Sequence, residues 1–236
     1  MEKKSDPFEA LRIRDFSFFI LARFTLTVAI LIQSVIVEWQ MYEITHDPLQ
    51  LGLIGLAEAV PFICIALFAG HVADIISRKR IIICATLFLI IGTLSLFYFS
   101  IDLESNVKHW GTLPIYAAIV ITGLSRGFLG PSYSSFLTQL VPKELYVSAA
   151  AWSSSAWQTG AVAGPAIAGI LYAYLGFTTS YAIDIVLILS SLIYILFIPA
   201  RPAAKKDRSE SVKNSISAGI KFVFSNQVLL AAISLD

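Results

Sequence analysis

Charged residues are scarce in this sequence. Asp, Glu, Lys and Arg make up 14% of its 236 residues, whereas a soluble globular domain carries roughly 25%. The shortage argues against a soluble protein. The 57% of hydrophobic residues and the mean hydropathy of +0.77 favour a chain that lies in lipid. A net charge of +1 says nothing about partners, and we expect no nucleic-acid partner.

Histidine and cysteine are equally rare. Three His and two Cys rule out a His/Cys-rich metal site and give no basis for a disulfide framework. The sequence has no HExxH, P-loop or GxGxxG pattern. Residues 123–127 match the GxSxG pattern of serine hydrolases, but they lie in an apolar helical run without the strand-to-helix turn that this motif requires. We therefore expect no enzymatic activity, no metal and no cofactor.

Long apolar runs dominate the rest of the chain. A helix needs about 20 apolar residues to cross a hydrocarbon core of about 30 Å. Six runs meet this length and predict the membrane spans Phe16–Tyr42, Leu49–Ala73, Ile81–Ile101, Leu113–Leu140, Val147–Leu175 and Phe177–Pro199. A seventh run, 222–236, is too short to span, so we expect the chain to stop within helix seven. The predicted class is all-α and polytopic.

The polar segments predict the domain organisation and the orientation. Residues 1–15 form a cytoplasmic amphipathic arm, 16–199 the six-helix bundle, and 200–221 a basic linker between two membrane halves. Fourteen Lys and Arg lie in the arm, in the linker and in the loops after the second and fourth spans, whereas the other three loops hold only Lys108. Cytoplasmic loops carry the excess of these residues. This distribution predicts a cytoplasmic N-terminus in the cell membrane.

Ionisable residues inside the spans are candidate functional groups, because a charge in the bilayer is costly to keep there. Arg126 lies near the middle of the fourth span, and Glu58 and Asp184 lie in the second and sixth. A nearby cation lowers the pKa of a carboxyl group and burial raises it, so Arg126 could control proton binding by one of these carboxylates. A static buried ion pair is the alternative. Arg23 and Glu38 lie nearer the surfaces and could simply extend their charged ends to the interface.

A stripe of small residues follows the fifth span at four-residue spacing. Small residues at this spacing let two helix backbones approach closely, and a proline inside a helix can kink it. The two interpretations are ordinary tight packing and a kinked helix that seals a cavity against leakage. The stripe consists of Ala156, Gly160, Gly164 and Ala168, with Pro165 and Gly169 beside it.

A carboxylate, Asp74, precedes the basic cluster of Arg78, Lys79 and Arg80 by about one turn. Charge pairs between such groups could hold a cytoplasmic gate closed. The alternative is that Lys79 and Arg80 only satisfy the excess of positive charge on the cytoplasmic side.

These segments resemble the motifs of the major facilitator superfamily. Gly70-x3-Asp74-x3-Arg78-Lys79 is similar to the signature between helices two and three, and Arg126-x3-Gly130 is similar to a second motif in helix four. The segment 160–169 is similar to the helix-five pattern of exchange-type exporters. The segments ALRIRDFSFF, residues 10–19, and TSYAIDI, residues 179–185, look most like the branch that contains siderophore and macrolide exporters.

The resemblance implies a twelve-helix, two-bundle fold with alternating access, of which this chain would supply the N-terminal half. Gly70, Asp74, Arg78 and Lys79 would belong to the cytoplasmic gate. Arg126 and Gly130, with Glu58 and Asp184 as candidate carboxylates, would form the proton-coupling site. Gly160, Gly164, Pro165 and Gly169 would help to seal the cavity.

The expected function is proton-driven export of small amphiphilic molecules, with a substrate site between this half and a C-terminal six-helix half. A nutrient symporter of the same fold is one alternative. A non-transporting six-helix partner subunit in the lipid bilayer is another. The substrate itself cannot be inferred from these residues.

Overall fold

The structure, a computed structural model, describes residues 8–201, apart from the side-chain positions of Leu67, Gly70, His71, Ala73, Asp74 and Ile75. This part of the chain is helical. The α-helices are α1 (Arg14–Thr45), α2 (Pro48–Ile75), α3 (Arg78–Ile101), α4 (Leu103–Trp110), α5 (Leu113–Leu140) and α6 (Tyr146–Phe197), and short 3-10 turns cover Ala10–Arg12 and Lys143–Leu145.

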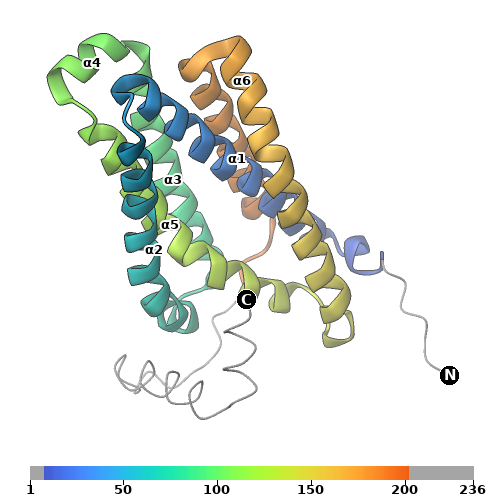
Figure 1. Cartoon of the computed structure of the whole chain (residues 1–236). Helices are drawn as coiled ribbons and strands as arrows, with labels where there is room; N and C mark the ends of the chain where they lie inside the picture. The colour runs from blue at the N-terminus through green and yellow to red at the C-terminus, as the bar shows by residue number, and fades with distance from the viewer. Residues whose placement is uncertain (1–7, 202–236) are drawn as a thin grey trace.

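Helix α6 is two antiparallel helices joined at Gly176. This residue has φ 71° and ψ −177°, a conformation that is essentially restricted to glycine. Figure 1 shows the chain reversing direction there, so that its second, orange part runs back along the bundle. The predicted spans 147–175 and 177–199 are the two parts of α6, and the predicted boundary between them is confirmed.

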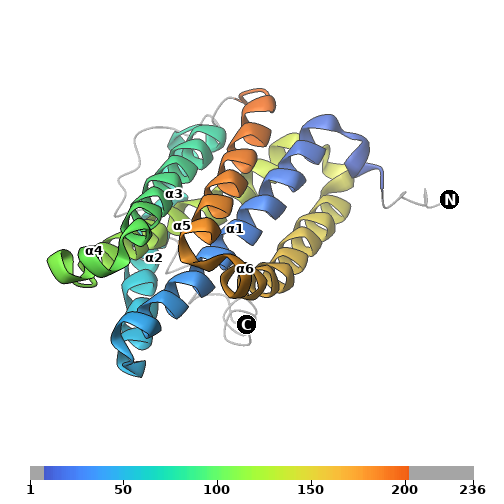
Figure 2. The ribbon, with the colours of Figure 1, turned by 90° about the horizontal axis from the view of Figure 1, so that it is seen from above.

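Helix α1 occupies the middle of the bundle, packing mainly against both parts of α6 (Figure 1). On the other side, α2 packs against α5, and α5 also packs against α3. Seen from above, the second part of α6 lies between α1 and α3 (Figure 2). Two clusters of buried apolar side chains fill the interior, one around Phe19 and Phe136 and the other around Ile36 and Tyr181.

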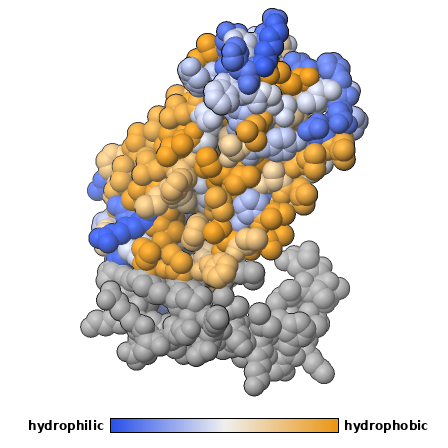
Figure 3. All heavy atoms as spheres, turned by 90° about the vertical axis from the view of Figure 1, so that its left-hand side faces the viewer, coloured by the Kyte–Doolittle hydropathy of each residue, from blue (hydrophilic) through white to orange (hydrophobic). Residues whose placement is uncertain are grey.

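The described helices fit a membrane. Five are long and apolar enough to cross one, and the last of these, Lys143–Phe197, has 55 residues and contains both parts of α6. Apolar side chains cover much of the face shown in Figure 3, with hydrophilic residues gathered towards the ends of the helices. The surface therefore agrees with the predicted all-α, multi-pass membrane protein.

Helix α4 is the element that the apolar runs did not predict. It has eight residues, begins where the Asp102 carboxylate accepts a hydrogen bond from the Ser105 amide at 3.3 Å, and carries an exposed Glu104–Lys108 pair at 2.7 Å. In the predicted arm, Phe8 packs against the ring of Trp152 with 5.5 Å between centroids. The predicted linker after Arg201 and the predicted start of helix seven lie outside the described residues.

Candidate functional site

The site begins with a close approach of α2 and α5, made possible by two glycines of α5. A methyl group at Gly123 would overlap the backbone oxygen of Glu58, and one at Gly127 would lie 2.9 Å from Cγ2 of Ile65. Ordinary side chains at these positions would push the helices apart. These are the two glycines of the GxSxG match. Their spacing is a helix-packing signal that the sequence analysis did not use at this position.

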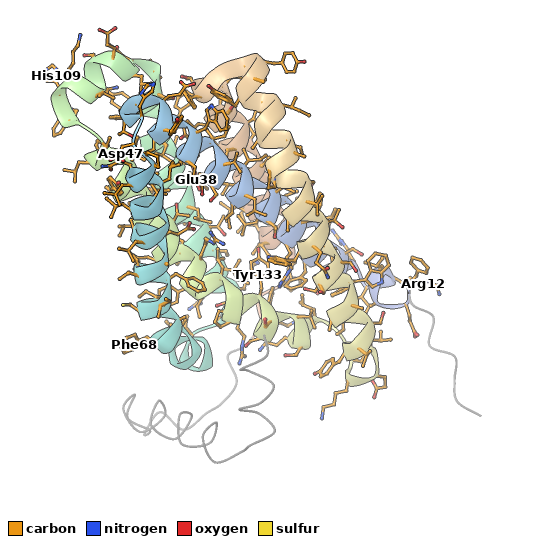
Figure 4. The ribbon with its side chains drawn as sticks, viewed as in Figure 1. Arg12, Glu38, Asp47, Phe68, His109 and Tyr133 are labelled. Carbon is orange, nitrogen blue, oxygen red and sulfur yellow. The ribbon has the colours of Figure 1, made fainter. Side chains whose placement is uncertain are left out.

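This close approach places Arg126 beside Glu58. The Arg126 guanidinium donates a hydrogen bond to Oε1 of Glu58, and the two groups form an ion pair between α5 and α2. The side chains are 36% and 19% exposed, respectively, so the pair is accessible and is not sealed in the core. Glu38 of α1, labelled in Figure 4, lies close enough to Glu58 for their carboxylates to repel each other. Of the two candidate carboxylates, Glu58 is therefore the one that lies beside Arg126.

A pocket of about 230 Å³ adjoins this pair, where α1, α2, α5 and the first part of α6 meet. Two arginines line it, one from α1 and one from α5, and aromatic and aliphatic side chains supply most of the remaining wall. Its lining is Arg23, Leu26, Thr27, Ile30, Leu31, Phe62, Arg126, Leu129, Gly130, Tyr133 and Trp157. Gly130 has no atom within 4 Å of the position that a methyl group would take, so it serves here as open wall.

A second pocket of about 380 Å³ shares Arg23 and Trp157 with the first. Hydroxyl groups are concentrated there, on Ser134, Thr138, Tyr146, Ser153 and Ser154. Both pockets have mostly apolar walls, and the polar groups of the second are mainly hydroxyls. Arg23 lies at the boundary between them.

Arg23 does not extend to a helix end as the sequence analysis allowed. Its guanidinium carbon lies 5.6 Å from the centroid of the Tyr133 ring, a cation–π arrangement. Tyr133 lies where α5 faces α1 (Figure 4) and packs on Phe19 with 5.5 Å between centroids. Among the described residues Arg23 makes no ion pair, and its buried Nε has no hydrogen-bond acceptor. Sequence reasoning missed this residue as part of the site.

Asp184 lies away from Arg126, between the second part of α6 and α3. It is fully buried, and Thr93 Oγ1 donates a long hydrogen bond of 3.5 Å to its Oδ2. Within residues 8–201 its Oδ1 has no hydrogen-bond partner. Asp184 is absent from the lining of both pockets. Of the two candidate carboxylates, the structure therefore brings only Glu58 to the arginine.

The predicted helix-five motif has two faces with different surroundings. A methyl group at Gly160 would lie 2.9 Å from Cγ2 of Thr27, and one at Gly164 would lie 2.7 Å from Cβ of Leu31, so both glycines seat the first part of α6 against α1. Pro165 and Gly169 are exposed, and Gly169 has open space around it. The packing interpretation describes one face of the motif, and the other face is free for further contacts.

Of the predicted gate residues, Gly70 and Asp74 lie in α2 near its end, and Arg78 and Lys79 lie at the start of α3. Lys79 donates hydrogen bonds to the backbone oxygens of Leu196, at 3.1 Å, and Ile198, and so satisfies carbonyl groups at the end of α6. Arg78 has a buried Nε without an acceptor. The side-chain positions of Gly70 and Asp74 lie outside the described residues, so their part in the gate stays a prediction. Through these hydrogen bonds Lys79 connects the start of α3 to the end of α6.

Comparisons with known proteins agree with this arrangement. A family model described as Major Facilitator Superfamily matches residues 18–235. Curated relatives include Enterobactin exporter EntS from Shigella boydii serotype 18 and from Escherichia coli O1:K1 / APEC. Each is 27% identical over 214 residues, a match that covers 89% of this chain and 49% of the relative. The chain thus spans about half the length of these relatives.

Solved structures share the fold at low identity. A POT family transporter in complex with 5-aminolevulinic acid matches with a TM-score of 0.68 at 15% identity, over 94% of this chain and 47% of that protein. The POT family transporter PepTSo matches with a TM-score of 0.63 at 15% identity, over 83% and 40%. Since the family model covers more than half of the sequence and the helices have the matching arrangement, the chain belongs to the major facilitator superfamily.

Proposed function

We propose that the protein is a secondary active exporter that couples entry of protons to expulsion of small amphiphilic molecules by alternating access. The observation that carries this proposal is the Glu58–Arg126 pair beside the pocket. An accessible ion pair inside membrane-spanning helices is costly to maintain, and such groups commonly mark proton or substrate pathways. The similarity to enterobactin exporters supports export as the direction.

A proton on Glu58 would change the balance of charges at the α2–α5 contact. The ionised carboxylate is attracted to Arg126 and repelled by Glu38, whereas the neutral acid loses both interactions. Protonation would therefore free Arg126 from its partner while leaving its positive charge at the pocket wall. Two states of the pair, closed and open, give the bundle an element whose position depends on proton binding.

The second half of the transporter would complete the site. We infer a C-terminal six-helix half that packs on the exposed face of α6 at Pro165 and Gly169 and encloses the two pockets. The same proposal places the protein in the cell membrane with its N-terminus in the cytoplasm and with a small molecule as its substrate. No cofactor is required, because the proton gradient supplies the energy.

The test uses the full-length protein in inside-out membrane vesicles with an imposed proton gradient. Uptake of enterobactin and of a neutral amphiphilic dye would be measured for the unaltered protein, Glu58→Gln and Arg126→Ala. We expect gradient-driven uptake to fall by at least tenfold in both variants while the protein remains folded. Lys108→Ala is a matched control, because it breaks an exposed ion pair on α4. Gradient-driven uptake that survives in Arg126→Ala would remove the pair from the coupling mechanism.

The same vesicles separate the alternative functions. A nutrient symporter would move its substrate in the same direction as the protons and would accumulate it in right-side-out vesicles. A non-transporting partner subunit would show no proton flux in either orientation, with or without Arg126.

A further inference from the structure

We propose that Arg23 binds an anionic group, such as a carboxylate, that is attached to an aromatic ring of the transported molecule. This inference rests on the proposed function, because it names the chemical class of molecule that the pockets accept. It assigns a binding role to a residue outside the gate, coupling and helix-five motifs.

Arg23 brings a positive charge to the wall of both pockets. A guanidinium group carries five N–H donors in a planar fork that matches the two oxygens of a carboxylate. Among the described residues no carboxylate pairs with Arg23, and its buried Nε lacks an acceptor. The Tyr133 ring stabilises the cation without accepting its in-plane hydrogen bonds. A partly buried cation without an anionic partner favours an incoming anion, which the outer nitrogens of the guanidinium group can bind.

The contrast with Arg126 strengthens this assignment. Both arginines line the first pocket, but Arg126 already pairs with Glu58. Arg23 is therefore the uncompensated positive charge of that pocket within the described part of the chain. Arg23 also lines the second pocket, so an anion that binds Arg23 could enter from either pocket.

The aromatic part of the ligand follows from Trp157. Trp157 shares both pockets with Arg23 and is 51% exposed, so part of its ring is free to contact a ligand. An indole face offers a stacking surface for a ligand ring. The hydroxyl groups of Ser153 and Ser154 lie in the wall of the second pocket and can bind polar substituents of such a ring. An aromatic acid fits this combination better than a cation or a purely aliphatic chain.

The experiment compares two probes that differ only in charge, 2-naphthoate and its neutral amide, 2-naphthamide. Binding to the purified full-length protein would be measured by equilibrium dialysis. We expect the unaltered protein to prefer the acid. Arg23→Gln should weaken binding of the acid by about 10- to 100-fold and leave binding of the amide unchanged. Arg23→Lys should retain part of the preference, because the charge remains and the fork is lost.

Arg14→Gln is the matched control. Arg14 lies on the same helix, loses the same charge on substitution and stacks on a ring in the same way, with its guanidinium carbon 5.5 Å from the Phe18 centroid. It lines neither pocket. Its substitution should leave the preference for the acid intact.

Equal binding of both probes by the unaltered protein would overturn the proposal. An equal loss of both probes in a folded Arg23→Gln variant would also overturn it, because it would mean that Arg23 pairs with a carboxylate of the other half. If Arg23→Gln does not fold, Arg23→Lys decides the matter, because a folded Arg23→Lys variant with an unchanged preference for the acid would overturn the proposal. An Arg23-dependent preference without gradient-driven transport would refute the exporter and keep this site. Gradient-driven transport without any preference for the acid would refute this binding site and keep the proposed exporter function.

Discussion

Gly164 and Gly169 lie five residues apart on one helix, and the structure predicts opposite effects for the same substitution. An added methyl group at Gly164 would lie 2.7 Å from Cβ of Leu31 and 3.2 Å from the backbone oxygen of Val28. At Gly169 the same methyl group would meet nothing within 4 Å. Gly164→Ala therefore forces α1 and α6 apart, and Gly169→Ala does not.

The magnitude follows from two terms. Inserting a methyl group into a tightly packed contact costs about 1–3 kcal/mol. Replacing Gly by Ala in a helix contributes up to about 1 kcal/mol in the opposite direction. The second term acts equally on both variants and cancels when they are compared. We therefore expect the free energy of unfolding of Gly164→Ala to be about 1–3 kcal/mol below that of Gly169→Ala.

The assay is reversible unfolding of the full-length protein in detergent, followed by tryptophan fluorescence. Gly164→Leu should amplify the loss or prevent folding, because the larger side chain has no room between the backbones. Equal stability of the two Ala variants would mean that α1 and α6 are not in close contact in the protein. Transport should also be measured in Gly169→Ala. A stable variant that no longer transports would show that the exposed face of the motif serves contacts with the other half.

Two further substitutions test other contacts. Gly123→Ala should separate α2 from α5 and move Glu58 away from its arginine, and should lower gradient-driven transport in vesicles by tenfold or more. Gly52→Ala on α2, where a methyl group would meet nothing within 4 Å, should leave transport within about twofold, and equal effects would contradict the close approach. Lys79→Met should lower the stability of the protein in thermal unfolding by about 1 kcal/mol, because it leaves carbonyl groups at the end of α6 without a donor. Lys108→Met, on exposed α4, should change stability by less than about 0.5 kcal/mol, and an equal loss there would remove the capping role.

The membrane spans could be predicted from the sequence because the bilayer imposes a minimum length of apolar helix. The bounds of α5 agree with the predicted span at both ends, and the break at Gly176 was placed correctly. Helix α4 was missed because eight residues with a polar face carry no such signal. Its only local signs are the cap at Asp102 and the charges four residues apart.

Individual site residues could be found from their cost in lipid, but their partners could not. Glu58, Asp184 and Arg126 all stood out as charges inside apolar runs. Which carboxylate meets the arginine depends on the register between packed helices, and two glycines set that register where α2 crosses α5. The spacing of Gly123 and Gly127 could have indicated this contact, because small residues four positions apart predict close helix packing in the fourth span as they do in the fifth.

Three of the ionisable residues inside the spans, Asp184, Arg126 and Arg23, have different partners, and this difference separates their roles. Asp184 is enclosed beside the Thr93 hydroxyl and lines neither pocket, so the described residues give it no direct part in either volume. Arg126 has a carboxylate partner and remains accessible, so in the proposed mechanism protonation of that partner would free its guanidinium group. Arg23 has an aromatic face but no described anion, and it faces both volumes. In the proposed mechanism one charge responds to proton binding and another binds the anionic group of the ligand, and the described residues supply a candidate for each.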